Sequence, residues 1–140
     1  TLLSLGWDIG RWTFNASAHR YGQIRGVAAT NQSAASVAEF AKGGTRFVTR
    51  PTEAGSAGNL DVIQILQAKW VGDLDVAYRV SDALRLVLGV NNVGNVYPTK
   101  NIATTAAVSG ADTYGVFPYS ELSPFGWSGA YYYGRIEVRF

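Results

Sequence analysis

The sequence has no cysteine and only one histidine, His19. Without cysteine the chain can form no disulfide, no thiolate metal site and no cysteine nucleophile. A lone histidine with no other ligand at a suitable spacing does not make a metal or acid–base site either. The sequence therefore predicts no catalytic residue, no metal and no cofactor, and we expect the protein not to be an enzyme.

Charge and long hydrophobic runs are also sparse. The 12 basic and 10 acidic residues leave a net charge of +2, and without a basic cluster this excludes nucleic acid as an expected partner. No apolar run approaches the roughly 18 residues of a membrane-spanning helix. Residues Thr1–Leu5 lack the basic region and cleavage site of a signal peptide, so we expect the N-terminal part of the protein to be missing here.

What the chain does have is a strict alternation of apolar and polar residues, which is clearest in its last ten residues. One side of an extended chain carries Tyr132, Gly134, Ile136, Val138 and Phe140. The other side carries Tyr133, Arg135, Glu137 and Arg139. A period of two predicts a strand with one apolar and one polar face. The same pattern predicts strands near 1–8, 11–27, 64–80, 84–92 and 127–140.

Short turns and long connections alternate between these strands. Tight turns are expected at Asp8–Gly10 and at Ser81–Ala83, whereas residues 28–62 and 92–126 are long connections. The capping-box spacing of Ser36 and Glu39 predicts a short helix over 37–42 in the first of them. The sequence thus predicts an all-β, antiparallel up-and-down meander. Short turns at one end and long loops at the other are typical of outer-membrane β-barrels.

Aromatic residues recur near the ends of the predicted strands. Trp70 and Tyr78 lie eight residues apart on one face, and at about 3.3 Å per residue with a tilt near ~40° this gives a height of roughly 20 Å. The apolar band between the aromatic girdles of a membrane barrel is about 25 Å tall. We expect one girdle from Trp7, Trp12, Tyr78 and Phe140, and the other from Trp70, Trp127 and Tyr132.

Charged side chains alternate along the same strands. An arginine on the lipid face near the midplane costs about 2–4 kcal/mol, whereas a barrel lumen is polar. We therefore expect an inward-facing salt-bridge ladder of Asp73, Asp75, Arg79, Arg85, Arg135 and Glu137. We expect an outward-facing, lipid-contacting set of Leu74, Val76, Leu86, Leu88, Ile136 and Val138. Paired carboxylates also suggest glycosidase chemistry. Asp73 and Asp75, however, are two residues apart on the same face of one strand, which favours the salt-bridge ladder.

Three aromatic residues of the second long connection, Tyr114, Phe117 and Tyr119, are the predicted ligand contacts. Binding residues are often carried by loops on a rigid scaffold, and aromatic rings offer large contact surfaces. The alternative is that these rings pack only against the loop itself.

Three stretches resemble TonB-dependent outer-membrane receptors. The first is Asp73–Leu84. The second is Leu86–Pro98, whose Asn91-Asn92 and Pro98 are similar to the family's entry into its last long loop. The third is Pro124–Phe140, which is similar to the family's closing strand. Val93-Gly94-Asn95 departs from the aromatic–acid pair usual in the second stretch.

The resemblance implies that residues 1–140 are the C-terminal strands of such a receptor barrel, with the plug domain and earlier strands absent. It implies uptake of a scarce solute, such as a ferric siderophore, cobalamin or an oligosaccharide, across the bacterial outer membrane. The implied partners are outer-membrane lipid, the TonB complex through an absent N-terminal segment, and the barrel assembly machinery through the strand ending at Phe140.

Family barrels have about 22 strands, so five strands are expected to form only an open sheet with edges near Leu3 and Phe140. Two other interpretations fit part of the pattern. One is a soluble β-barrel or sandwich that acts as a binding module, since alternation alone does not say which face is inside. The other is a passive porin-like barrel assembled from several chains.

Overall fold

The structure is a computed structural model, and it describes residues 1–53, 55–102, 118–119 and 123–140. The described residues divide into two units. The first unit comprises Thr1–Tyr21, Lys69–Tyr97 and Ser128–Phe140, and the second comprises Gly22–Ala68 and Pro98–Trp127. The elements in chain order are β1 (Leu2–Ile9), β2 (Trp12–Tyr21), β3 (Ile24–Gln32), α1 (Ala34–Lys42), β4 (Phe47–Pro51), β5 (Leu60–Leu66), β6 (Lys69–Arg79), β7 (Leu84–Asn91) and β8 (Tyr131–Val138).

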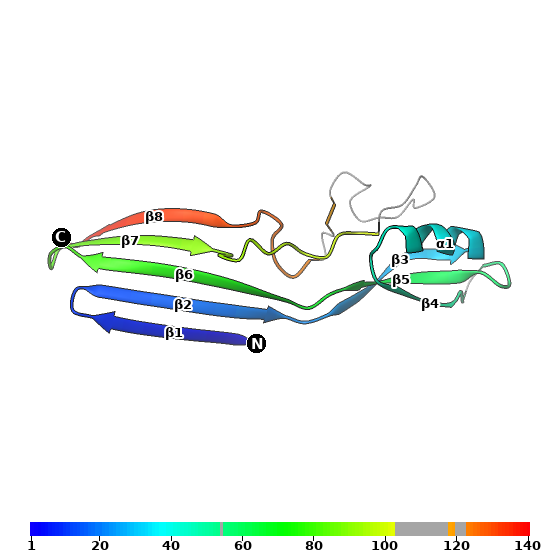
Figure 1. Cartoon of the computed structure of the whole chain (residues 1–140), viewed down its shortest axis with the longest axis horizontal. Coiled ribbons are helices and arrows are strands. Elements are labelled where there is room, and N and C mark those ends of the chain that lie inside the picture. Colours follow the sequence, from blue (N-terminus) through cyan, green and yellow to red (C-terminus); the bar gives the residue numbers. More distant parts are fainter. Residues whose placement is uncertain (54, 103–117, 120–122) are drawn as a thin grey trace. The chain divides into compact units, whose positions relative to one another are not determined.

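The first unit is a five-stranded sheet in the order β1-β2-β6-β7-β8, and every neighbouring pair is antiparallel (Figure 1). This confirms the predicted all-β, antiparallel class and the up-and-down order of the five predicted strands. Among the described residues β1 pairs only with β2 and β8 only with β7. The sheet is therefore open, with β1 and β8 as its two edges, as expected.

Both short turns of this sheet lie at the same end, which we call the turn end (Figure 1). The β1–β2 loop is Gly10-Arg11, between the paired residues Ile9 and Trp12. Gly10 has φ +59°, the positive value that a type II′ hairpin loop requires at its first position. The β8 strand also ends at the turn end, and the Arg139 amide that follows it donates to the Ala83 carbonyl at 2.9 Å.

The second unit contains a three-stranded sheet, ordered β3-β5-β4, with α1 packed against it. Phe40 of α1, Val62 of β5 and Ile102 form its buried core. The buried side chain of Gln64 holds the 100–102 segment to β5, because its Nε2 donates to the Lys100 carbonyl and its Oε1 accepts from the Ile102 amide, at 2.9 and 3.2 Å.

This second sheet corrects the prediction of a long connection over 28–62. That segment holds most of β3 together with α1, β4 and the start of β5. The predicted strand 11–27 is two strands separated at Gly22-Gln23, and 64–80 is two strands separated at Gln67-Ala68. Neither β3 nor β5 has a regular apolar period, so the sequence pattern does not mark either boundary.

The helix and the last strand also have different bounds. The α1 helix starts at Ala34 instead of Val37, because Ser33 caps it: its side-chain oxygen accepts from the Ser36 amide at 3.2 Å. The strand predicted over 127–140 is β8, Tyr131–Val138. It begins after Ala130, whose amide donates to Asn95 Oδ1 at 3.0 Å instead of joining the ladder.

Candidate functional site

The five-stranded sheet carries its charges on one side, except for Arg20, which lies on the other side at the end of β2 away from the turns. The register places a set of uncharged residues on this other side, which we call the apolar face: Leu3, Leu5, Trp7, Ile9, Trp12, Phe14, Ala16, Ala18, Trp70, Gly72, Leu74, Val76, Tyr78, Leu84, Leu86, Leu88, Val90, Tyr132, Gly134, Ile136 and Val138. Leu5, Leu88 and Ile136 are 70%, 65% and 69% exposed. The predicted outward-facing residues all belong to this face.

The aromatic residues of the apolar face cluster at the turn end. Trp12 pairs with Tyr78 across β2 and β6, with ring centroids 4.6 Å apart. Phe14 lies 6.2 Å from Trp12 and 6.3 Å from Trp7. This places three of the predicted girdle residues together, and Phe140 follows β8 at the same end.

The other predicted girdle is more scattered. Trp70 lies at the end of β6 away from the turns, opposite Arg20 of β2. Tyr132 lies opposite Val90, whose partner on β6 is Leu74, nearer the middle of the sheet. Trp127 belongs to the second unit.

The opposite side, which we call the polar face, carries all six of the predicted inward-facing charges. Ala77 and Val87 lie among them and are only 1% and 2% exposed, because long charged side chains cover small neighbours with their alkyl stems. Small apolar side chains are thus covered on the polar face while large ones are exposed on the apolar face, unlike a sheet that packs its apolar face and turns its polar face to water.

The expected salt-bridge ladder forms only in part. Glu137 forms ion pairs with two arginines, Arg85 at 3.4 Å and Arg135 at 3.0 Å. The aspartates bind neutral donors instead: Asp75 accepts from Asn15 Nδ2 at 2.9 Å. Asp73 accepts from the Ser17 hydroxyl at 3.4 Å and from the Asn92 amide at 2.8 Å. The two aspartates act as acceptors that tie neighbouring strands and the β7 exit together.

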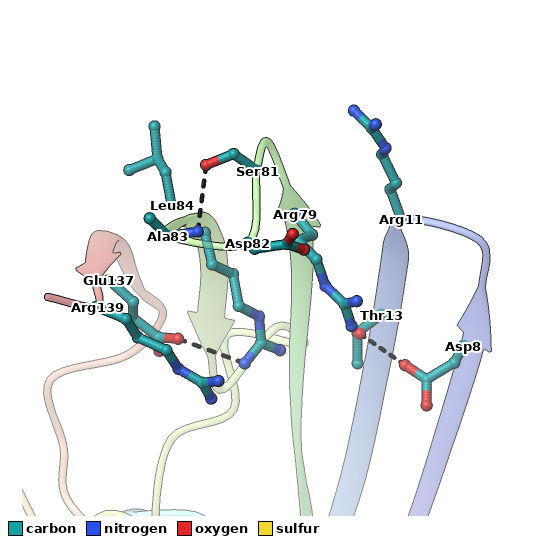
Figure 2. Close-up of a pocket in the computed structure, with 11 residues that line it drawn as sticks. Asp8, Arg11, Thr13, Arg79, Ser81, Asp82, Ala83, Leu84, Glu137 and Arg139 are labelled. Carbon is teal, nitrogen blue, oxygen red and sulfur yellow. Dashed lines mark hydrogen bonds and ion pairs between the residues drawn. The ribbon is translucent and has the colours of Figure 1, made fainter.

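A pocket of about 500 Å³ lies at the turn end of the polar face (Figure 2). Its polar residues come from both turns and from the strands next to them. Asp8 accepts from the Thr13 hydroxyl at 2.6 Å, and Arg11 Nη1 donates to the Val80 carbonyl at 3.3 Å. The remaining charged residues of the lining are Arg79, Asp82, Arg85, Glu137 and Arg139.

A second hollow, of about 450 Å³, lies on the apolar face. Its lining includes Leu5, Phe14, Leu74, Leu88 and Tyr132. It has the apolar lining of a site for a hydrophobic molecule but few polar groups to orient one.

Asn92, at the exit of β7, has a structural role that the sequence pattern did not reveal. Its Nδ2 donates to the Val96 carbonyl at 2.7 Å, and its Oδ1 accepts from the Val96 amide at 2.8 Å. It has φ +54°, a conformation that asparagine tolerates better than most residues. Its side chain therefore closes a turn that ends the strand.

The predicted ligand contacts are only partly placed. Tyr114 and Phe117 lie outside the described residues. Tyr119 is in the second unit, half-buried and bridged to Lys100. His19 lies on the polar face opposite Leu2 and Val71 and stacks at 6.1 Å on Tyr21. Within the described ranges, no group of three or more histidine or acidic side chains is placed to hold a metal ion.

The second unit contains one strongly held carboxylate. Asp61, 3% exposed, accepts from the Asn31 amide at 3.1 Å and from Arg50 Nε at 3.2 Å. The Asn31 hydrogen bond, together with Thr52 and Arg50, lowers the pKa of Asp61 below its usual value, although burial acts in the other direction. This carboxylate joins the ends of three strands and is fixed by structural contacts.

Comparison of the chain with protein families, with curated proteins and with solved structures found no match. No helix in the described part of the chain has the length and apolar character needed to cross a membrane.

Proposed function

We propose that the five-stranded sheet is a section of the wall of a large transmembrane β-barrel in the bacterial outer membrane. The observation that carries this proposal is the apolar face, which exposes leucine, isoleucine and tryptophan side chains and carries one charge, Arg20, at the end of β2 away from the turns. Exposed apolar surface of this extent is unfavourable in water and marks a binding or membrane surface. Contact with lipid removes this free-energy cost, because the apolar side chains are then no longer exposed to water.

The lengths of the strands agree with a membrane crossing. They contain 8, 10, 11, 8 and 8 residues, and a tilted transmembrane strand needs about 9–11. The short turns then lie on the periplasmic side and the long connections on the outer side.

The open edges require further strands in this setting. Each unsatisfied backbone group costs several kcal/mol in lipid, so membrane sheets close into barrels. Strands beyond those described here therefore pair with the free edges of β1 and β8. This agrees with a sheet that is the last part of a larger barrel.

We further propose that this barrel is a TonB-dependent receptor that takes up a scarce solute, such as a ferric siderophore, cobalamin or an oligosaccharide. The support is the resemblance of Asp73–Leu84, Leu86–Pro98 and Pro124–Phe140 to that family. Its partners are then outer-membrane lipid, the TonB complex, and the barrel assembly machinery at the β8 strand. Uptake by cells that make the intact protein should stop when their TonB complex is removed.

A matched pair of substitutions on β1 tests the membrane assignment. Leu5 and Ser4 are neighbours and both are exposed, but Leu5 lies on the apolar face and Ser4 on the polar face. Leu5→Arg should reduce the folding free energy in lipid vesicles by about 2–4 kcal/mol, whereas Ser4→Arg should have little effect. Equal tolerance of both changes contradicts a lipid-facing surface.

The apolar hollow supports a second candidate, a soluble module that binds a hydrophobic molecule. In that case the intact protein stays dissolved and folded without detergent or lipid, and Leu5→Arg weakens binding of a fluorescent apolar probe without preventing folding.

A further inference from the structure

Two arginines lie directly opposite each other at the turn end of the polar face. Arg79 of β6 is paired with Arg85 of β7, and Arg85 is paired on its other side with Glu137 of β8. Like charges directly opposite on neighbouring strands are destabilising. Glu137 relieves only one of the two, because its carboxylate contacts Arg85 and Arg135.

The other carboxylates of the pocket leave this repulsion in place. Asp8 is engaged by the Thr13 hydroxyl at 2.6 Å, and among the described residues Asp82 makes no ion pair. Within the described part of the chain Arg79 and Arg139 make no ion pair, and both line the pocket, as Figure 2 shows. The lining thus has four arginines and three carboxylates. One of these carboxylates, Glu137, also pairs with Arg135, which lies outside the lining.

We propose that this pocket binds a small oxyanion with at least two negative charges, held by Arg79, Arg85 and Arg139. The guanidinium group presents a planar set of donors that matches phosphate and carboxylate oxygens. An anion between Arg79 and Arg85 replaces their repulsion with two attractive contacts. The volume of about 500 Å³ lies within the range of small-molecule sites, roughly 300–1,000 Å³. The site goes beyond the proposed transport function, because it is argued from the strand register and the lining of the pocket.

Inorganic pyrophosphate and citrate are the probes, titrated calorimetrically into the full chain in detergent micelles at constant ionic strength. Pyrophosphate tests phosphate oxygens and citrate tests carboxylates. Arg79→Gln should weaken binding of the preferred probe about tenfold or more, the usual effect of losing a charged hydrogen bond. Arg20→Gln is the control, because Arg20 lies opposite Trp70, away from the pocket, and should leave the affinity unchanged.

Glu137→Gln separates a binding site from a structural arginine cluster. It removes the carboxylate that competes for Arg85, so the anion should bind about tenfold more tightly. If the arginines serve only to pair with Glu137, the same change gives no gain. Absence of binding by both probes, equal effects of Arg79→Gln and Arg20→Gln, or weaker binding in Glu137→Gln would each overturn the proposal.

Discussion

At the residue scale, Gly89 of β7 leaves space on the polar face that the ring of Tyr133 fills. The two residues are direct cross-strand partners, and a Cβ built on Gly89 would overlap the Tyr133 ring. Gly89→Ala should therefore reduce stability by about 1–3 kcal/mol, the usual cost of overpacking. Urea unfolding in lipid or detergent measures the change.

Two further variants show whether the ring is the cause. Gly134→Ala places its Cβ at an ordinary 3.5 Å from Leu88 and should cost clearly less. Combining Gly89→Ala with Tyr133→Ala should remove most of the penalty, as a double-mutant cycle reports. A penalty that persists without the tyrosine ring would mean that the glycine is needed for its backbone instead.

Asn92 allows a second prediction at this scale. Asn92→Ala removes both side-chain bonds to Val96 and retains a φ of +54°, so it should cost about 1–3 kcal/mol. Asn92→Gly also removes the bonds but relieves the backbone, and should be the milder change. Thermal unfolding of the two variants gives the comparison, and a milder Asn92→Ala would contradict the turn-closing role.

Part of the site was predictable at this scale and part was not. Alternation placed Asp73 and Asp75 on one face of their strand, because successive side chains point to opposite sides, and the cost of an arginine in lipid placed Arg85 with them. It did not reveal their partners. Those depend on register, which brings Asn15 rather than an arginine opposite Asp75. The same register sets Arg79 against Arg85.

At the element scale, the second sheet should respond to acid through Asp61. Its pKa is lowered in the folded state, so its contribution to stability is complete above the unfolded value near 3.8 and is lost as pH falls through the lower folded value. Hydrogen exchange of the Asn31 amide should therefore become less protected, relative to its intrinsic rate, below about pH 4.

Asp61→Asn is the control for this acid response. It keeps the shape of the side chain but cannot titrate, so amide protection at Asn31 should be lower at neutral pH and should change less between pH 5 and 2. An unchanged acid transition in Asp61→Asn would assign the response to another carboxylate.

The second sheet was also the element least visible in the sequence. β3 is rich in small residues and has two irregularities in its pairing with β5, so it shows no regular alternation. β5 is apolar on both faces with buried Asp61 and Gln64, and a short apolar run of this kind has no diagnostic period. The strands of the first unit were predicted correctly because each has one apolar face and one polar face.

At the scale of the whole molecule, the open sheet and its apolar face point to the same environment. An edge strand with free backbone groups promotes aggregation in water, and β1 combines such an edge with large exposed apolar side chains. Both features are accommodated when further strands continue the sheet and lipid covers its apolar side.

Tryptophan depth in the membrane tests this arrangement directly. Trp12 and Trp70 lie toward opposite ends of the apolar face, and Leu74 lies between them along β6. In variants of the intact protein with one tryptophan each, the Leu74→Trp position should be quenched best by lipids brominated near the acyl-chain ends. Trp12 and Trp70 should be quenched best by lipids brominated near the headgroups, because girdle residues lie at the two interfaces.

The polar face supplies the matched control for this measurement. Tyr133 lies on β8 next to Tyr132 but on the opposite face, so a Tyr133→Trp variant should be shielded from brominated lipid while Tyr132→Trp is quenched. Quenching of position 133 in preference to 132 would reverse the assignment of the two faces. Absence of quenching at both would place the sheet outside the bilayer, because a lipid-facing side chain at this depth cannot avoid contact with acyl chains.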